Sequence, residues 1–93
     1  MKMIILILKD QLTDALTAQL TSAKYRVTRI ASTGGFLRSG VSTLLIGVEE
    51  AQVESAISLI RTSVPAGPAA EPQATLFVVP VARYEQVQAL VVK

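Results

Sequence analysis

Residues 3–8 read Met-Ile-Ile-Leu-Ile-Leu, and this apolar run decides the fold. Its length and its β-branched residues are typical of a central strand that is covered on both faces. Lys9 and Asp10 end the run, which is far shorter than the roughly 18 apolar residues of a membrane span and too short for a signal-peptide core. The run therefore predicts the first strand of a sheet and no membrane span.

A helix, a strand and a loop are expected next. Apolar residues at helical spacing predict a helix that Asp10 caps and that ends near Lys24. Alternation over residues 25–32 predicts a strand with Arg26 and Thr28 on one face. Three glycines in residues 33–40 predict a loop. The apolar positions of the helix are Leu12, Ala15, Leu16, Leu20 and Ala23.

The second half of the chain repeats this pattern. A β-branched stretch predicts a strand over residues 42–48, and the acids Glu49 and Glu50 favour a helix start directly after it. Three prolines in residues 63–72 exclude regular structure there, and residues 74–79 predict the last strand. The tail over residues 81–93 fits either a short helix, from the spacing of Tyr84, Val87 and Val91, or a strand at residues 90–92. The apolar positions of this second helix are Val53, Ala56, Ile57 and Ile60.

The order βαββαβ predicts one domain over residues 1–93, an α+β ferredoxin-like sandwich with two helices on one face of the sheet. Apolar residues make up 51% of the chain, and its mean hydropathy is +0.48. A domain of this size hides only roughly 60 to 65% of its unfolded surface. The other face of the sheet therefore needs a partner, and we expect a soluble cytoplasmic protein that associates with itself in a closed ring.

The chain lacks the residues that several classes of protein function require. Without cysteine or histidine the chain has no thiol nucleophile, no imidazole or thiolate metal ligand and no usual general base. No phosphate loop, dinucleotide fingerprint or catalytic triad is present, so we expect no catalytic residue, metal site or cofactor. An enzyme of the carboxylate type would rest on four acids that are better explained as helix-start acids. These acids are Asp10, Asp14, Glu49 and Glu50.

Basic residues gather in the middle of the chain. No acid lies between Asp14 and Glu49, and the bases in that window are Lys24, Arg26, Arg29 and Arg38. This asymmetry favours an anionic ligand, although solvated surface charges explain it equally well. Glycines in residues 33–40 let the backbone approach a ligand, and Phe36 offers a face on which a base can stack. A plain hairpin turn is the alternative for the glycines.

Five stretches of the chain carry a family resemblance. They are residues 1–5 (MKMII), Arg26 with Thr28, residues 33–38 (TGGFLR) with Gly40, residues 47–48, and residues 74–81 (ATLFVVPV). Together they resemble the PII-like cyclic-di-AMP receptor family of bacteria over nearly the whole chain. The resemblance implies a homotrimer of ferredoxin-like subunits that binds cyclic di-AMP in the clefts between them, without catalysis.

The same resemblance implies the ligand-binding residues. They are Arg26, Thr28, Gly35, Phe36, Leu37, Gly47, Phe77 and Gln86. The first two are contacts from the second strand, and the next three form the loop that receives a base. Gly47 leaves space for the ligand, while the last two contact a base from the last strand and the tail. From the residues alone, Phe77 also fits the core, and Thr28 and Gln86 fit an ordinary polar surface.

This chain departs from the family at three places. Lys24 and Val41 stand where family members typically have asparagine, and residues 63–72 are a short version of a long loop. The leading hypothesis is a trimeric PII-like sensor of cyclic di-AMP or a related adenine nucleotide, which signals to a protein partner through the loops 33–40 and 63–72. No nucleic acid is expected as a partner. The alternative is a PII-like interaction module whose nucleotide binding is altered or lost.

Overall fold

The computed structural model describes residues 1–30, 40–65 and 72–87. The elements follow the order expected from the sequence, with one short 3₁₀ turn added before the second helix. They are β1 (Lys2–Lys9), α1 (Asp10–Ser22), β2 (Arg26–Ile30), β3 (Val41–Val48), η1 (Glu50–Gln52), α2 (Val53–Ser63) and β4 (Ala74–Pro80). Residues 81–87 are not helical, and residues 90–92, where the sequence left a strand open, lie outside the described residues.

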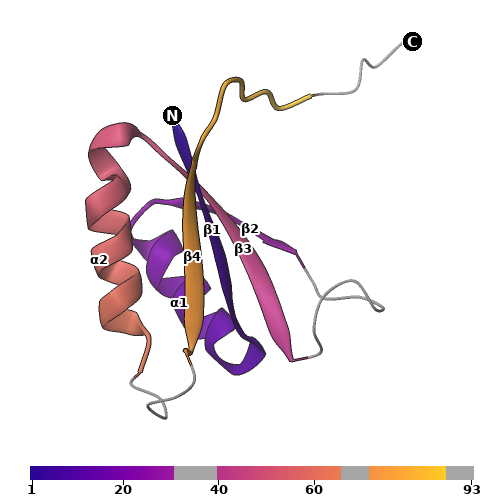
Figure 1. Cartoon of the computed structure of the whole chain (residues 1–93), viewed down its shortest axis with the longest axis vertical. Coiled ribbons are helices and arrows are strands. Elements are labelled where there is room, and N and C mark those ends of the chain that lie inside the picture. The colour runs from indigo at the N-terminus through magenta and orange to yellow at the C-terminus, as the bar shows by residue number, and fades with distance from the viewer. Residues whose placement is uncertain (31–39, 66–71, 88–93) are drawn as a thin grey trace.

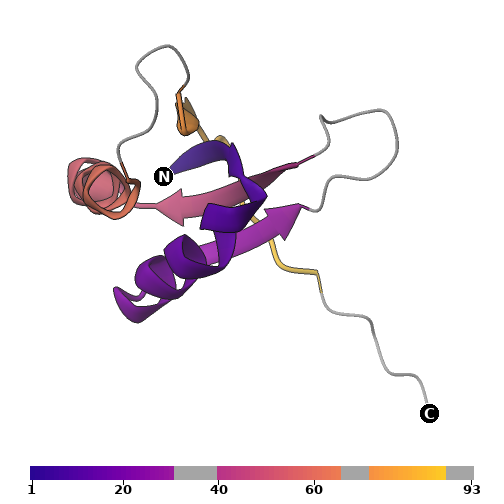
Figure 2. The same cartoon turned by 90° about the horizontal axis from the view of Figure 1, so that it is seen from below.

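The four strands form one antiparallel sheet in the order β2-β3-β1-β4. Strand β1 lies inside the sheet between β3 and β4, as its apolar run predicts. Both helices lie on the same side of the sheet (Figures 1 and 2). This small α+β arrangement is compatible with the ferredoxin-like fold that the sequence predicts.

The core lies between the sheet and the helices. It is built from alternate residues of the two inner strands and from one stripe of each helix, because side chains alternate across a strand. Its members are Ile4, Leu6, Leu8, Leu16, Leu20, Leu44, Ile46, Val48, Ala56 and Ile60. The prediction for α1 was wrong at Ala15 and Ala23, which are exposed, whereas Thr13 is fully buried.

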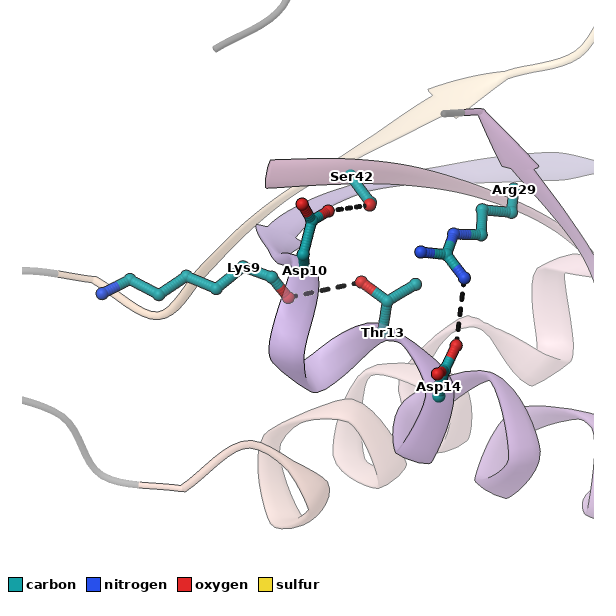
Figure 3. Close-up of polar contacts among 6 residues, drawn as sticks. All are labelled: Lys9, Asp10, Thr13, Asp14, Arg29 and Ser42. Atoms are coloured by element: carbon teal, nitrogen blue, oxygen red, sulfur yellow. Dashed lines mark hydrogen bonds and ion pairs between the residues drawn. The ribbon is translucent and has the colours of Figure 1, made fainter. Parts of the chain in front are cut away.

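The start of α1 also differs from the prediction. Lys9 occupies the N-cap position without a side-chain cap, and Asp10 is the first helical residue. The Asp10 carboxylate instead accepts a hydrogen bond from the Ser42 hydroxyl (Figure 3). The Asp10 amide donates to the Gly40 carbonyl at 2.9 Å. Gly40 has a φ of 85°, a conformation that favours glycine. Asp10 therefore ties the helix to β3 rather than capping it.

The end of α1 places a lysine in a left-handed conformation. Lys24 has a φ of 72°, and its amide donates to the Thr21 carbonyl at 2.9 Å. The Tyr25 amide donates to the Leu20 carbonyl at 3.0 Å. This pair of bonds is the Schellman motif, which turns the chain sharply from the helix into β2 and usually has glycine or asparagine at this position.

The face of the sheet opposite the helices, here called the open face, is made by the other set of alternate residues. Met3, Ile5 and Ile7 of β1 are half-buried there. On the edge strands, Ile30 is 42% and Phe77 is 53% exposed. The open face is thus apolar and only partly buried within one chain, as the apolar excess of the composition predicts.

Within residues 1–30, 40–65 and 72–87, no helix is long and apolar enough to cross a bilayer.

Candidate ligand site

A pocket of about 620 Å³ lies at the end of the sheet where β1 begins and β4 ends. Four of the residues predicted to bind a ligand line it, namely Arg26, Thr28, Gly47 and Gln86. They come from β2, β3 and the segment after β4, so the fold brings together positions that are far apart in the sequence.

Cross-strand pairing explains how β2 and β3 build one wall. Arg26 lies opposite Gly47, and Thr28 lies opposite Leu45. Residues that face each other across two antiparallel strands project from the same side of the sheet. Arg26 and Thr28 therefore stand on the open face, and Gly47 beside Arg26 has no side chain to fill the space. A Cβ at Gly47 would lie 3.5 Å from the Met1 Cε, which is ordinary contact. Glycine therefore leaves free space here rather than relieving a clash.

The segment after β4 forms another wall. The Val81 amide donates to the Met1 carbonyl at 3.1 Å, which holds the start of this segment beside the N-terminus. Further along, the Tyr84 hydroxyl accepts a hydrogen bond of 2.9 Å from Nη1 of Arg26. Sequence reasoning missed Tyr84. Its spacing of two from Gln86 was the available signal, because in an extended segment such residues share a side.

The charge of the pocket favours an anion. Its described lining holds the basic residues Lys2 and Arg26 and no acidic residue. Lys2 pairs with Glu50 at 3.7 Å, whereas the Arg26 guanidinium donates to the Tyr84 hydroxyl and not to a carboxylate of the described residues. The other N–H donors of Arg26 can therefore bind a phosphate in the pocket.

Arg29 belongs to the opposite face of the sheet. It stands three residues from Arg26 on the same strand, so alternation turns it toward α1. There its Nη1 donates to the Asp14 carboxylate at 3.0 Å (Figure 3). Arg29 therefore forms an ion pair with the helix and does not line the pocket. Lys24 is exposed at the end of α1 and does not line the pocket.

Phe77 does not reach the pocket. It lies on the open face of β4, opposite Ile5, and is 53% exposed. Strands β2 and β4 are the two edges of the sheet, so three spacings of about 4.8 Å separate Phe77 from Thr28, its counterpart in register, and Arg26 lies two residues further along, about 16 Å from Phe77. The core interpretation of Phe77 is wrong, and within one chain it cannot share a ligand with Arg26 at close range.

The remaining predicted contacts, Gly35, Phe36 and Leu37, lie outside the described residues, as does Arg38. Val41 is half-buried at the start of β3 and does not line the pocket. It stands six residues from Gly47, which corresponds to about 20 Å along a strand. A second cavity, of about 470 Å³ between the end of α2 and β4, contains none of the predicted contacts.

The four acids on which an enzyme hypothesis would rest have different partners and do not form one site. Asp10 accepts from Ser42, Asp14 pairs with Arg29, and Glu50 pairs with Lys2. Glu49 forms a capping box with Gln52 at the start of η1. In the part of the chain that the structure describes, no three acidic residues gather to hold a metal ion.

Comparison with known proteins adds a family to this geometry. Residues 1–67 match the sequence profile of the family described as the cyclic-di-AMP receptor. The chain belongs to this receptor family. The matched part contains Arg26, Thr28 and Gly47, together with the loop at 33–40, whereas Phe77 and Gln86 lie beyond it.

A solved structure extends the likeness over nearly the whole chain. The chain is similar to a functionally unknown protein from Pediococcus pentosaceus, known from its crystal structure, with 30% sequence identity and a TM-score of 0.72. The similarity covers 92% of this chain and 96% of that chain. The fold of this receptor-family member is therefore shared beyond the matched residues 1–67.

Proposed function

We propose that this protein is a PII-like signalling protein that binds cyclic di-AMP, or a related adenine nucleotide, at clefts between the subunits of a homotrimer. The observation that carries the proposal is the pocket itself. The pocket brings together Arg26, Thr28, Gly47 and Gln86, and its described lining has no acidic residue. The chain that forms it belongs to the cyclic-di-AMP receptor family.

Each of these groups suits a part of a cyclic dinucleotide. The Arg26 guanidinium forms charge-assisted bonds with a phosphate, and the Thr28 hydroxyl adds a neutral donor beside it. Gly47 leaves room for the ligand against the backbone of β3, and the Gln86 amide offers both a donor and an acceptor to a base edge. Together they bind and orient a ligand, and no reaction step is assigned to them.

The distances within one chain support a site shared between subunits. Phe77 lies about 14 Å from Thr28, and Val41 lies about 20 Å from Gly47. A neighbouring subunit packed on the apolar open face would bring such residues toward the pocket and would cover Ile30 and Phe77. The single domain of residues 1–93 then acts as one third of a closed ring.

Signalling to a protein partner is the output that we assign to the two loops, 33–40 and 63–72. Both loops connect to the sheet where β1 ends and β4 begins, at the end opposite the pocket of the same chain. The proposal therefore requires a ligand in a shared cleft to act on the loops of a neighbouring subunit. The proposed partner is a cytoplasmic protein, and no nucleic acid is proposed as a partner.

Calorimetry with cyclic di-AMP, cyclic di-GMP, ATP, ADP and AMP tests the ligand. We expect heat of binding with cyclic di-AMP or another of the adenine nucleotides, and none with cyclic di-GMP. Light scattering at micromolar protein concentration tests the assembly, because a stable 9.9 kDa monomer would contradict the shared cleft.

The second candidate is an interaction module that has lost the nucleotide. The observations that favour it are Val41 and the short connection between α2 and β4, both of which depart from the family pattern. A trimer that gives no heat with any of the five nucleotides would support this candidate over the first.

A further inference from the structure

Tyr84 joins the segment after β4 to the pocket. Its hydroxyl accepts a hydrogen bond of 2.9 Å from Nη1 of Arg26, which lies 58 positions earlier in the sequence. Residues 82–87 are all exposed, and Tyr84 lines the pocket together with Arg26 and Gln86. Tyr84 is therefore exposed, but its hydroxyl is bound to the Arg26 guanidinium at the pocket.

The hydrogen bond restricts the side chain that meets the phosphate. An exposed arginine samples many rotamers, and fixing it in one of them on binding is unfavourable in entropy. The bond to Tyr84 fixes Arg26 in advance and uses only part of its N–H donors. The other donors remain available to an anion in the pocket.

We propose that Tyr84 is a positioning residue, which holds Arg26 ready for the phosphate and thereby couples ligand binding to the segment 81–87. The inference rests on the proposed nucleotide site and deepens it by naming how that site is regulated. Because such coupling is reciprocal, a ligand that needs Arg26 in this position also strengthens the attachment of the segment. The segment is then more firmly held in the bound protein.

Binding measurements with two variants of the segment 81–87 test the positioning role. Tyr84→Phe removes only the hydroxyl and should raise the dissociation constant for cyclic di-AMP about threefold to tenfold. Glu85→Gln is the control, because Glu85 lies beside Tyr84 on the same segment, pairs with Arg83 and does not line the pocket. That variant should change the constant less than about twofold.

A double-variant cycle separates positioning from a direct contact. If Tyr84 acts through Arg26, then Tyr84→Phe should have no further effect once Arg26→Ala is present. Losses that add in the double variant would overturn the positioning role, as would a Tyr84→Phe protein that binds like the wild type. If the wild type binds none of the adenine nucleotides, the proposed function and the positioning role are both overturned. Additive losses in a protein that does bind overturn the positioning role alone, so the two failures are distinguishable.

Trypsin provides a readout that needs no ligand. The bond after Arg83 precedes Tyr84, and its cleavage can be followed by mass spectrometry. We expect Tyr84→Phe and Arg26→Ala to accelerate this cleavage by a similar factor, with no addition in the double variant, and cyclic di-AMP to slow it in the wild type. Equal cleavage rates in the wild type and both variants would overturn the coupling to the segment.

Discussion

The two faces of the sheet are built from the same strands and have different surroundings. On the helix side, alternate residues of β1 and β3 are fully buried, and Arg29 of β2 pairs with Asp14 of α1. On the open face, β1 is half-buried, Phe77 is exposed, and Arg26 stands at a pocket. One face therefore specifies the fold, while the other leaves apolar side chains partly exposed and forms the pocket.

Neighbouring isoleucines of β1 give the sharpest test of this division. Ile4→Ala empties a fully buried position and should lower the free energy of unfolding by about 2 to 5 kcal/mol. Ile5→Ala changes the same side chain on the open face, so its effect on one subunit should be smaller, while it should shift the proposed trimer toward monomer. Urea unfolding and light scattering measure the two effects. Equal losses of stability, with assembly unchanged, would contradict the division.

The two arginines of β2 provide the next comparison. Arg26→Ala should weaken nucleotide binding by about 1.5 to 3 kcal/mol, since a charge-assisted contact is lost at an exposed position. Arg29→Ala removes the same group from the helix side and should leave the affinity unchanged. Calorimetry on both variants decides the matter. Should Arg29→Ala weaken binding as much as Arg26→Ala, the charge would act over the whole strand rather than at the pocket.

Two aspartates of α1 test the helix side alone. Asp10→Ala leaves the buried Ser42 hydroxyl without its partner and should cost about 1 to 3 kcal/mol of stability. Asp14→Ala breaks an exposed ion pair with Arg29, for which about 0 to 1 kcal/mol is expected. Thermal unfolding of both variants at low and high salt provides the measurement. Only the small loss at Asp14 should disappear in high salt.

The smallest effect concerns the turn between α1 and β2. Lys24→Gly should stabilise the protein by about 0.5 to 1 kcal/mol, because glycine adopts the left-handed conformation without a steric cost. Lys24→Ala removes the same charge but keeps the Cβ, so it should bring no such gain. Denaturant midpoints compare the two. An equal gain from both variants would mean that the charge, and not the backbone, is unfavourable here.

The sequence predicted what depends on local pattern. The apolar run of β1 placed that strand inside the sheet, and alternation in β2 put Arg26 and Thr28 on one face and Arg29 on the other. These periodicities follow directly from strand geometry. The order of the elements was correct for the same reason.

Contacts between distant residues could not be predicted in this way. Asp10 resembled a helix cap, but its partner is Ser42, which lies 32 positions away on β3. Likewise, the bond between Arg26 and Tyr84 depends on where the segment after β4 lies. The separation of Phe77 from the pocket follows from the strand order, which a single sequence does not state.

The pairing of Arg26 with Gly47 also limits how this chain tolerates insertions and deletions. Side chains alternate with a period of two, so deleting one residue from the turn at 23–25, with the strand kept at its place in the sheet, would shift each residue of β2 by one position and exchange its two faces. Arg29 would then point to the open face, and Arg26 would no longer stand beside Gly47. A change of two residues would restore the alternation. Variants that gain or lose an odd number of residues in this turn should therefore lose the ligand even when they still fold.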